Sequence, residues 1–194
     1  MKKIAITGTI GSGKSTCSEI LRELGWPVFD CDEAARQAQK KDGEAYQKIV
    51  QHFEDILDEN GELDRKKLAA EIFSCEKKKR LLESLVHPSI FKAMNEEIKQ
   101  AKRLFFAEVP TLYESGWEIY FDAVLLISVN EQVRTERLSL NRKMNEEEIR
   151  QRVQNQISDQ SKKEMATWII ENNSTKEELK EKIKLWLDSL LKEV

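Results

Sequence analysis

Short apolar runs recur along the chain and are separated by longer segments with helical spacing. The apolar runs cover residues 3–7, 27–30, 104–109 and 123–129, and a weaker one covers residues 168–170. Unbroken apolar runs of this length, rich in β-branched and aromatic residues, are typical of buried parallel strands. We therefore expect an α/β fold with a parallel sheet.

Segments with helical spacing lie between and after these runs. They predict helices over residues 14–24, 131–142, 146–157 and 176–192. Gly25 is a typical stop for the first, and Thr175 with Glu178 forms a capping box for the last.

A long helical stretch interrupts the alternation of strands and helices. It follows a helix that we expect from residue 33, with Asp32 as N-cap, and it covers residues 44–102. Asn60-Gly61 predicts a turn, and His87-Pro88 predicts a break at which the proline begins a new helix. This stretch is an excursion from the sheet.

Bulk composition narrows the class of protein. The 194 residues suit one α/β domain, and 40% hydrophobic with 35% charged residues indicates a globular protein. The net charge of -3 gives no overall attraction to nucleic acid or anionic membranes. The three cysteines form no disulfide or zinc pattern, and we find neither a signal peptide nor a membrane span. We expect a soluble, cytoplasmic protein without nucleic-acid or membrane partners, and its oligomeric state is open.

One glycine-rich loop carries the clearest chemistry. It matches G-x-x-x-x-G-K-[ST] and lies between a predicted strand and a predicted helix, with the sequence Gly8-Thr9-Ile10-Gly11-Ser12-Gly13-Lys14-Ser15. In such a loop backbone N–H groups surround the β-phosphate, Lys14 bridges the β- and γ-phosphates, and Ser15 holds Mg²⁺. A glycine turn with a solvated lysine is the alternative, but the strand-loop-helix context favours nucleoside triphosphate binding.

Kinases, switches and motors share this loop. The sequence lacks the N-K-x-D motif with which a GTPase reads its base, and Asp58-Glu59-Asn60-Gly61 has the composition of a polar turn. A GTPase is therefore disfavoured. A kinase and a nucleotide-dependent regulatory module without an acceptor remain open.

Further motifs make the chain resemble the dephospho-CoA kinase family over nearly its whole length. The motifs occur in the family's order and are Ile4 to Thr16, Asp30-Cys31-Asp32, Gly61-Glu62-Leu63-Asp64-Arg65, Leu85-Val86-His87-Pro88, Glu108 to Glu114 and Ala166 to Asn172. The chain departs from the family's usual residues at Thr9, Thr111, Tyr113, Thr167 and Glu171.

The resemblance implies a role for Asp32. The second carboxylate of the family's D-x-D is its general base for the acceptor hydroxyl, and a carboxylate after the second strand lies at the edge of the sheet where ligands bind. A helix N-cap would also explain Asp32 from its position, but the resemblance favours the general base. Asp30 could be linked to Mg²⁺ through water.

The resemblance also implies a lid whose arginines neutralise charge on the transferring phosphoryl group. The family's lid position holds a basic cluster made of Arg134, Arg137, Arg142 and Lys143. We rank Arg142 first. Arg150 and Arg152 follow Glu146 and Glu148 by four residues, so we interpret them as a solvated helix face.

Three further residues have two interpretations each. Asn172 would lie near the adenine or in a packed strand end. Glu108 would hold Mg²⁺ through water or simply end a strand. His87 would act in the acceptor region or serve as a capping or packing residue.

The sequence thus predicts a P-loop NTPase-type three-layer fold in one domain, residues 1–194, with a helical acceptor-binding excursion over about 44–102 and a lid over about 137–152. The reaction that the resemblance implies is ATP-dependent phosphorylation of the ribose 3′-hydroxyl of dephospho-CoA, the last step of coenzyme A biosynthesis. The alternative is a kinase of another small alcohol, such as a nucleoside or a shikimate-like compound. Catalytic candidates are Asp32, Lys14, Arg142 and Arg137; nucleotide-binding candidates are Gly8, Gly11, Ser12, Gly13, Lys14, Ser15, Thr16 and Asn172; the Mg²⁺ candidate is Ser15.

Overall fold

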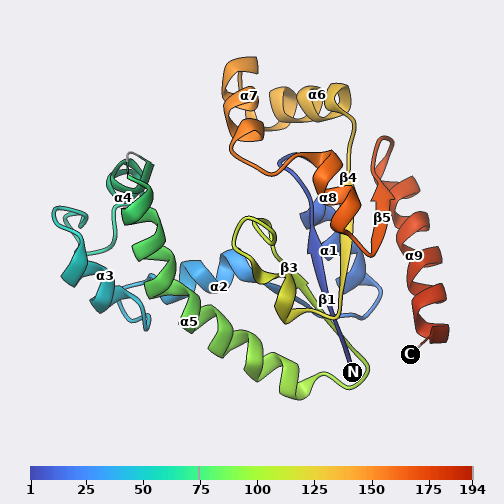
Figure 1. Ribbon diagram of the computed structural model, residues 1–194, viewed down its shortest axis with the longest axis horizontal. Helices are drawn as coiled ribbons and strands as arrows, with labels where there is room; N and C mark the ends of the chain where they lie inside the picture. Colours follow the sequence, from blue (N-terminus) through green and yellow to red (C-terminus); the bar gives the residue numbers. More distant parts are fainter. Residues whose placement is uncertain (74, 194) are drawn as a thin grey trace. The chain divides into compact units, whose positions relative to one another are not determined.

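A computed structural model describes residues 1–73 and 75–193, and the strands form one five-stranded sheet (Figure 1). The strands are β1 (Lys2–Thr7), β2 (Val28–Asp30), β3 (Leu104–Glu108), β4 (Ala123–Ser128) and β5 (Trp168–Glu171). Their order is β2-β3-β1-β4-β5, and β1 pairs in parallel with β3 and β4, as β4 does with β5. The predicted parallel sheet is confirmed.

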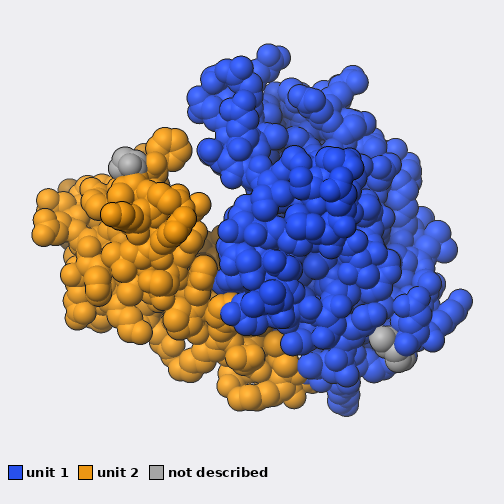
Figure 2. All heavy atoms as spheres, in the orientation of Figure 1, with its two compact units in different colours: residues 1–29, 101–194 blue, residues 30–100 orange. Residues whose placement is uncertain are grey.

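The chain divides into two compact units, coloured separately in Figure 2. One unit comprises residues 1–29 and 101–194, and the other comprises residues 30–100. The helices of the first unit are α1 (Lys14–Glu23), α6 (Glu131–Arg142), α7 (Glu146–Gln154), α8 (Asp159–Met165) and α9 (Lys176–Glu193), with the 3₁₀ turn η1 (Trp117–Tyr120). The helices of the second are α2 (Cys31–Ala38), α3 (Tyr46–His52), α4 (Arg65–Phe73) and α5 (Glu76–Gln100).

Helices cover both faces of the sheet in the first unit. Alternate strand residues, among them Ile6 and Phe106, form a core with α1 and α9, to which α9 contributes Ile183. Residues on the other face are also buried, including Ala107 and Leu126, and α8 contacts β4. Because successive strand residues point to opposite faces, both faces are covered, which explains the apolar runs in the sequence.

The long helix α5 organises the second unit, where it contacts α2, α3 and α4. The predicted break at His87-Pro88 is wrong, because α5 continues through Pro88. Val86, Ile90 and Met94 lie four residues apart and are all buried. Packing of this stripe outweighs the local cost of about 3 kcal/mol that proline brings to a helix interior.

The N-cap of α2 is Asp30 and not Asp32, which corrects the sequence prediction. Asp30 has extended backbone angles, and its carboxylate accepts a hydrogen bond of 2.9 Å from the backbone N–H of Glu33. The helix begins at Cys31, so Asp32 lies in its first turn and is exposed. The capping explanation therefore belongs to Asp30, and Asp32 needs another.

The remaining helix predictions differ from the structure in the region after α6. The predicted helix 131–142 is confirmed, with Asn130 as its N-cap. The predicted helix 146–157 ends earlier, as α7, and the short helix α8 was not predicted. Ser158, whose side chain accepts from the backbone N–H of Ser161, was the available signal for α8.

The predicted turn at Asn60-Gly61 is confirmed. The Asp58 carboxylate accepts hydrogen bonds from the backbone N–H groups of Asn60 and Glu62, and Gly61 has a φ of 72°.

In the part of the chain that the structure describes, none of the helices is long and apolar enough to cross a membrane.

Candidate active site

The glycine-rich loop joins β1 to α1, and two of its glycines leave no room for a side chain. A Cβ on Gly8 would lie 2.3 Å from the carbonyl oxygen of Ile127 in β4. A Cβ on Gly13 would lie 2.3 Å from the side-chain nitrogen of Asn172, and Gly13 has a φ of 93°. At Gly8 and Gly13 the loop backbone therefore approaches its neighbours too closely for a residue larger than glycine.

The third glycine packs against α6. A Cβ on Gly11 would lie 3.1 Å from Cγ of Leu138 and 3.2 Å from Cγ of Arg134, and the φ of Gly11 is 77°. Gly8, Gly11 and Gly13 thus bring the loop against β4, α6 and the segment after β5. Elements from the second half of the chain fix its shape.

Lys14 is the first residue of α1, whose N-cap is Gly13. Its Nζ donates hydrogen bonds to the backbone carbonyls of Gly8, at 2.8 Å, and Thr9, at 3.1 Å, so the ammonium group curls over the loop. The first turn of a helix leaves backbone N–H groups without partners in the helix and carries a partial positive charge. Loop, helix end and ammonium group together form an anion-binding site.

Ser15 and Glu108 place two oxygen ligands beside this site. The hydroxyl of Ser15 donates a hydrogen bond of 3.0 Å to Oε1 of Glu108, which ends β3 and is buried. Among the described residues no group of three or more His, Cys, Asp or Glu side chains could hold a metal. One hydroxyl and one carboxylate suit Mg²⁺, which takes few protein oxygens and completes its octahedron with phosphates and water.

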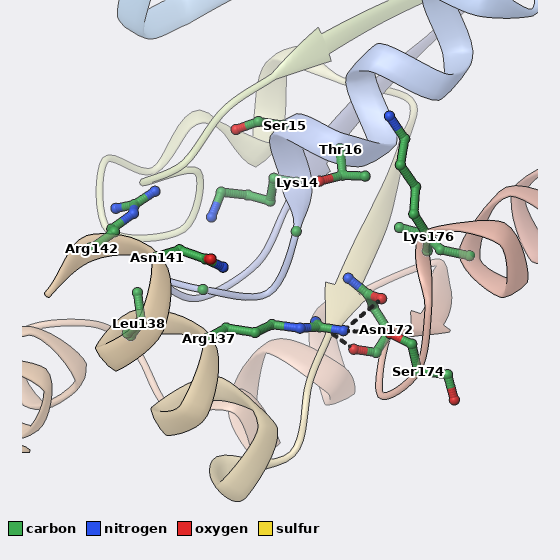
Figure 3. A pocket seen from close by; sticks show the side chains of 13 residues that line it. Lys14, Ser15, Thr16, Arg137, Leu138, Asn141, Arg142, Asn172, Ser174 and Lys176 are labelled. Atoms are coloured by element: carbon green, nitrogen blue, oxygen red, sulfur yellow. Dashed lines mark hydrogen bonds between the residues drawn. The ribbon is translucent and has the colours of Figure 1, made fainter. Parts of the chain in front are cut away.

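The segment after β5 is tied to the loop through Asn172. This residue is buried, and its Nδ2 donates a hydrogen bond of 2.8 Å to the backbone carbonyl of Ser12. Figure 3 shows Arg137 extending from α6 toward the same segment. Its guanidinium donates to the backbone carbonyls of Asn172, at 2.8 Å, and Ser174, at 2.7 Å. Arg137 therefore holds this segment against α6.

These elements line one cavity of about 490 Å³ in the unit of residues 1–29 and 101–194. It brings together eight of the candidate residues, which are Gly11, Gly13, Lys14, Ser15, Thr16, Arg137, Arg142 and Asn172. Figure 3 shows Lys14 and Arg142 at the same end of this cavity. Gly8 and the buried Ser12 belong to the loop but not to the wall, and Asp32 belongs to the other unit.

Sequence reasoning missed several residues on this wall. They are Leu138, Asn141, Ser174, Lys176 and Leu179. Asn141 and Leu138 lie on the predicted helix 131–142, on which only the basic residues were singled out. Lys176 and Leu179 open α9, and no motif marks them.

Two basic residues near the predicted lid differ from expectation. Arg134 is buried, forms an ion pair with Asp159, and donates to the carbonyl of Val129 at 3.4 Å. Burial lowers the pKa of Arg134, in part offset by the negative charge of Glu131. Arg150 pairs with Glu147, three residues away, and not with Glu146, four residues away.

The predicted pair of Glu148 with Arg152 is also replaced. Glu148 and Asn145 instead form a capping box at the start of α7. Glu148 accepts from the backbone N–H of Asn145 at 3.0 Å, and Asn145 accepts from that of Glu148 at 2.9 Å. Arg150 and Arg152 are exposed, so their interpretation as a solvated face holds.

Two further buried groups in the same unit have shifted pKa values. Burial, together with the negative charge of Glu108, raises the pKa of the Cys17 thiol far above its ordinary value. Burial, with Glu118 nearby, raises the pKa of Tyr113 to about 12. Both groups stay protonated at neutral pH, so neither is a nucleophile or base.

Known proteins resemble this chain over nearly its whole length. The family described as "Dephospho-CoA kinase" matches residues 2–178. A dephospho-CoA kinase of Bacillus cereus is 38% identical over 192 residues, covering 94% of this chain and 96% of the relative.

Solved structures also resemble the chain over nearly its whole length. A Thermus thermophilus protein called TT1252 is 34% identical with a TM-score of 0.86, covering 97% of each chain. A dephospho-CoA kinase of Campylobacter jejuni is 25% identical with a TM-score of 0.70, covering 97% of this chain and 96% of its own. Because the family matches residues 2–178 and the relatives align over nearly the whole chain, the chain belongs to the dephospho-CoA kinase family.

Proposed function

We propose that the chain transfers the γ-phosphoryl group of ATP to the ribose 3′-hydroxyl of dephospho-CoA, giving CoA and ADP, with Asp32 as the general base. The observation that carries the proposal is the cavity that Lys14 and Ser15 of the glycine loop line together with Arg142. Family membership favours this acceptor over a nucleoside or a shikimate-like compound. The chain is a kinase that uses ATP as phosphate donor.

ATP binding is assigned to the loop and its supports. Backbone N–H groups of the loop and the start of α1 bind the β-phosphate, and the Lys14 ammonium group moves from the Gly8 and Thr9 carbonyls to the β- and γ-phosphates. The adenine would lie toward Asn172 and Arg137, at the part of the cavity that the segment after β5 lines.

Mg²⁺ would be held by the hydroxyl of Ser15, with Glu108 as a second ligand directly or through water. When bound, the ion would neutralise charge on the β- and γ-phosphate oxygens. The Ser15 oxygen has lone pairs for the ion, and its hydroxyl proton would stay on Ser15 in the hydrogen bond to Glu108.

Asp32 would take the proton of the 3′-hydroxyl as that oxygen attacks phosphorus. An alcohol is a poor nucleophile, and a positioned carboxylate contributes about 10² to 10⁴ in rate. Arg142, exposed on the cavity wall, would neutralise charge that develops on the transferring phosphoryl group. Residues 137–152 would form the lid that carries Arg142. Residues 44–102 would hold the acceptor. Both segments would belong to a single functional domain, residues 1–194.

The partners inferred from this reaction are small molecules, without nucleic acid or membrane, and the proposed location is the cytoplasm. Neither inference depends on oligomeric state.

One coupled assay tests the function. ADP release is measured with Mg²⁺ and ATP, with dephospho-CoA present or absent, and adenosine and shikimate serve as comparison acceptors. ADP release that requires dephospho-CoA, and that stops when EDTA replaces Mg²⁺, is expected. Release that is independent of any acceptor would support the regulatory alternative instead.

A further inference from the structure

One backbone group of the glycine loop is bound by a side chain from the far end of the chain. The N–H of Ile10 donates a hydrogen bond of 2.9 Å to Oε1 of Gln156, 146 residues away in sequence. Gln156 is half-buried and lies just after α7, between α7 and α8. This contact fixes the loop immediately before Gly11, where α6 packs against it.

The segment that carries Gln156 is itself anchored by a buried ion pair. Lys162 of α8 is completely buried, and its Nζ lies 2.8 Å from Oε1 of Glu114. The same carboxylate oxygen accepts a hydrogen bond of 3.0 Å from the backbone N–H of Ile157, the neighbour of Gln156. A buried lysine is rare unless it is paired, so Lys162 keeps the Glu114 carboxylate beside it. Because that carboxylate also accepts the Ile157 N–H, the ion pair holds Ile157 in a defined position.

A second ion pair joins the same segment to α6. Asp159 pairs with the buried Arg134, and Cγ of Arg134 is one of the atoms nearest to Gly11. Within seven residues, 156–162, the chain is therefore tied to the loop, to α6 and to the segment after β3. We call residues 156–162 the strap.

We propose that Gln156 is a positioning residue for the phosphate-binding loop, and that the Glu114–Lys162 ion pair holds the strap from which it acts. This rests on the proposed function only in assigning ATP phosphates to the loop. The strap begins two residues after α7, so the chain that leaves the proposed lid is held to the glycine loop by the Ile10–Gln156 contact.

The physical consequence concerns ATP binding more than chemistry. A loop already held in its binding conformation loses less freedom when phosphates arrive, which strengthens binding. The Ile10 contact joins a loop N–H to Gln156 and involves neither Lys14 nor Arg142, so we expect it to serve ground state and transition state alike. Loss of such uniform binding raises KM and leaves kcat nearly unchanged.

The decisive variants change Gln156 alone. Gln156→Leu keeps the size of the side chain and removes the acceptor oxygen, while Gln156→Glu keeps an acceptor. Gln154→Leu is the matched control, since Gln154 is exposed at the end of α7. Amide hydrogen exchange of Ile10 is measured in the nucleotide-free protein, and ATP affinity is measured by calorimetry, which requires no acceptor.

The expected result is that Gln156→Leu speeds exchange at Ile10 and weakens ATP binding about 3- to 10-fold, the size of one net hydrogen bond. KM for ATP rises by the same factor, kcat changes less than about twofold and KM for dephospho-CoA is unchanged. Gln156→Glu keeps Ile10 protected, and the control resembles the wild type. Unchanged ATP affinity in Gln156→Leu, or a fall in kcat as large as the rise in KM, would overturn the proposal.

The anchor is tested by a second pair of variants. Lys162→Met leaves the partly buried Glu114 carboxylate without its cation, so it lowers thermal stability and speeds exchange at Ile10. Adding Glu114→Gln removes the unpaired charge and keeps an acceptor for Ile157, so stability and Ile10 protection recover. A double variant that is stable but leaves Ile10 as exposed to exchange as in Gln156→Leu would refute the anchoring role. If the wild type binds ATP but does not phosphorylate dephospho-CoA, the proposed function fails while these measurements still decide the role of the strap.

Discussion

The side-chain nitrogen of Asn172 lies 2.8 Å from the backbone carbonyl oxygen of Ser12, and it also occupies the place that a Cβ on Gly13 would need. One amide group therefore both binds the glycine loop and requires a glycine beside it. Because Asn172 is buried, water does not readily replace the hydrogen bond.

We predict that Asn172→Ala weakens ATP binding and lowers stability together. The change removes a hydrogen bond to the loop and opens a space beside Gly13, so we expect a loss of about 1 to 3 kcal/mol in the free energy of unfolding. ATP affinity should fall severalfold because the loop is less well held. Urea denaturation and calorimetry measure the two effects, and Asn95→Ala, on an exposed face of α5, is the control. Stability equal to the wild type would contradict the structural role of Asn172.

Lys14→Ala should abolish phosphoryl transfer and leave the fold intact. The Lys14 ammonium group donates to the loop carbonyls of Gly8 and Thr9 and is not part of the hydrophobic core, so its loss removes phosphate contacts and leaves the core packing in place. Circular dichroism and ADP release are the measurements. Lys102→Ala, an exposed change elsewhere in the same unit, should behave as the wild type in both. A folded Lys14→Ala protein with wild-type turnover would refute the assignment of the loop.

The two arginines on the cavity wall should respond differently to removal. Arg137 donates to the carbonyls of Asn172 and Ser174, so Arg137→Ala should mainly weaken ATP binding by loosening that segment. Arg142 is exposed on the wall, so Arg142→Ala should lower kcat more than ATP affinity, because it acts where charge develops. Calorimetric ATP titration beside steady-state turnover separates the effects. Equal losses in both quantities for Arg142→Ala would count against its role in transfer.

Sequence patterns predicted those parts of the candidate site that are built from residues close together in the sequence. The strand, glycine loop and helix around Lys14 follow from neighbouring residues, and helix 131–142 was predicted with its observed ends. The contacts that complete the site are not local. Asn172 reaches Ser12 across 160 residues and Gln156 reaches Ile10 across 146, and a single sequence has no periodicity that reports such pairs.

Other errors arose because tertiary packing outweighs local preference. From its neighbours in sequence, Pro88 predicts the start of a helix. In the structure α5 continues through Pro88, because its buried residues Val86, Ile90 and Met94 stabilise the helix on both sides of the proline. Both Asp30 and Asp32 are acceptable N-caps by residue type. Which of them caps α2 depends on where β2 ends, and a strand boundary is uncertain by a few residues when read from sequence.

The stability of the protein should fall as the pH drops from 8 to 6, in part because of His87. Burial lowers the pKa of His87 in α5, with Glu83 opposing the shift, whereas the unfolded side chain titrates near about 6.5. The unfolded state therefore binds more protons than the folded state, and the free energy of unfolding decreases as pH falls through this range. Urea denaturation at both pH values should show a smaller decrease for His87→Gln than for the wild type. The exposed His52, changed to Gln, is the control, and equal decreases in both variants would exclude His87 as the source.

Asp30 and Asp32 offer a direct separation of a cap from a base. Asp30 accepts the hydrogen bond from the Glu33 backbone N–H, so Asp30→Ala should cost about 0.5 to 2 kcal/mol of stability. Asp32 does not cap α2, so Asp32→Asn should leave stability unchanged while removing a basic carboxylate from an exposed position in the first turn.

If Asp32 accepts the proton of the 3′-hydroxyl, turnover of Asp32→Asn at saturating ATP and dephospho-CoA should fall by about 10² to 10⁴. Asparagine matches aspartate in size, so a fall of this kind at constant melting temperature reports lost basicity and not lost structure. Melting curves and ADP release for both variants, with Asp30→Asn as the variant that keeps the cap, make the comparison. An Asp32→Asn enzyme that retains most of its activity would remove Asp32 from the mechanism, since no other role assigned to it would survive that result.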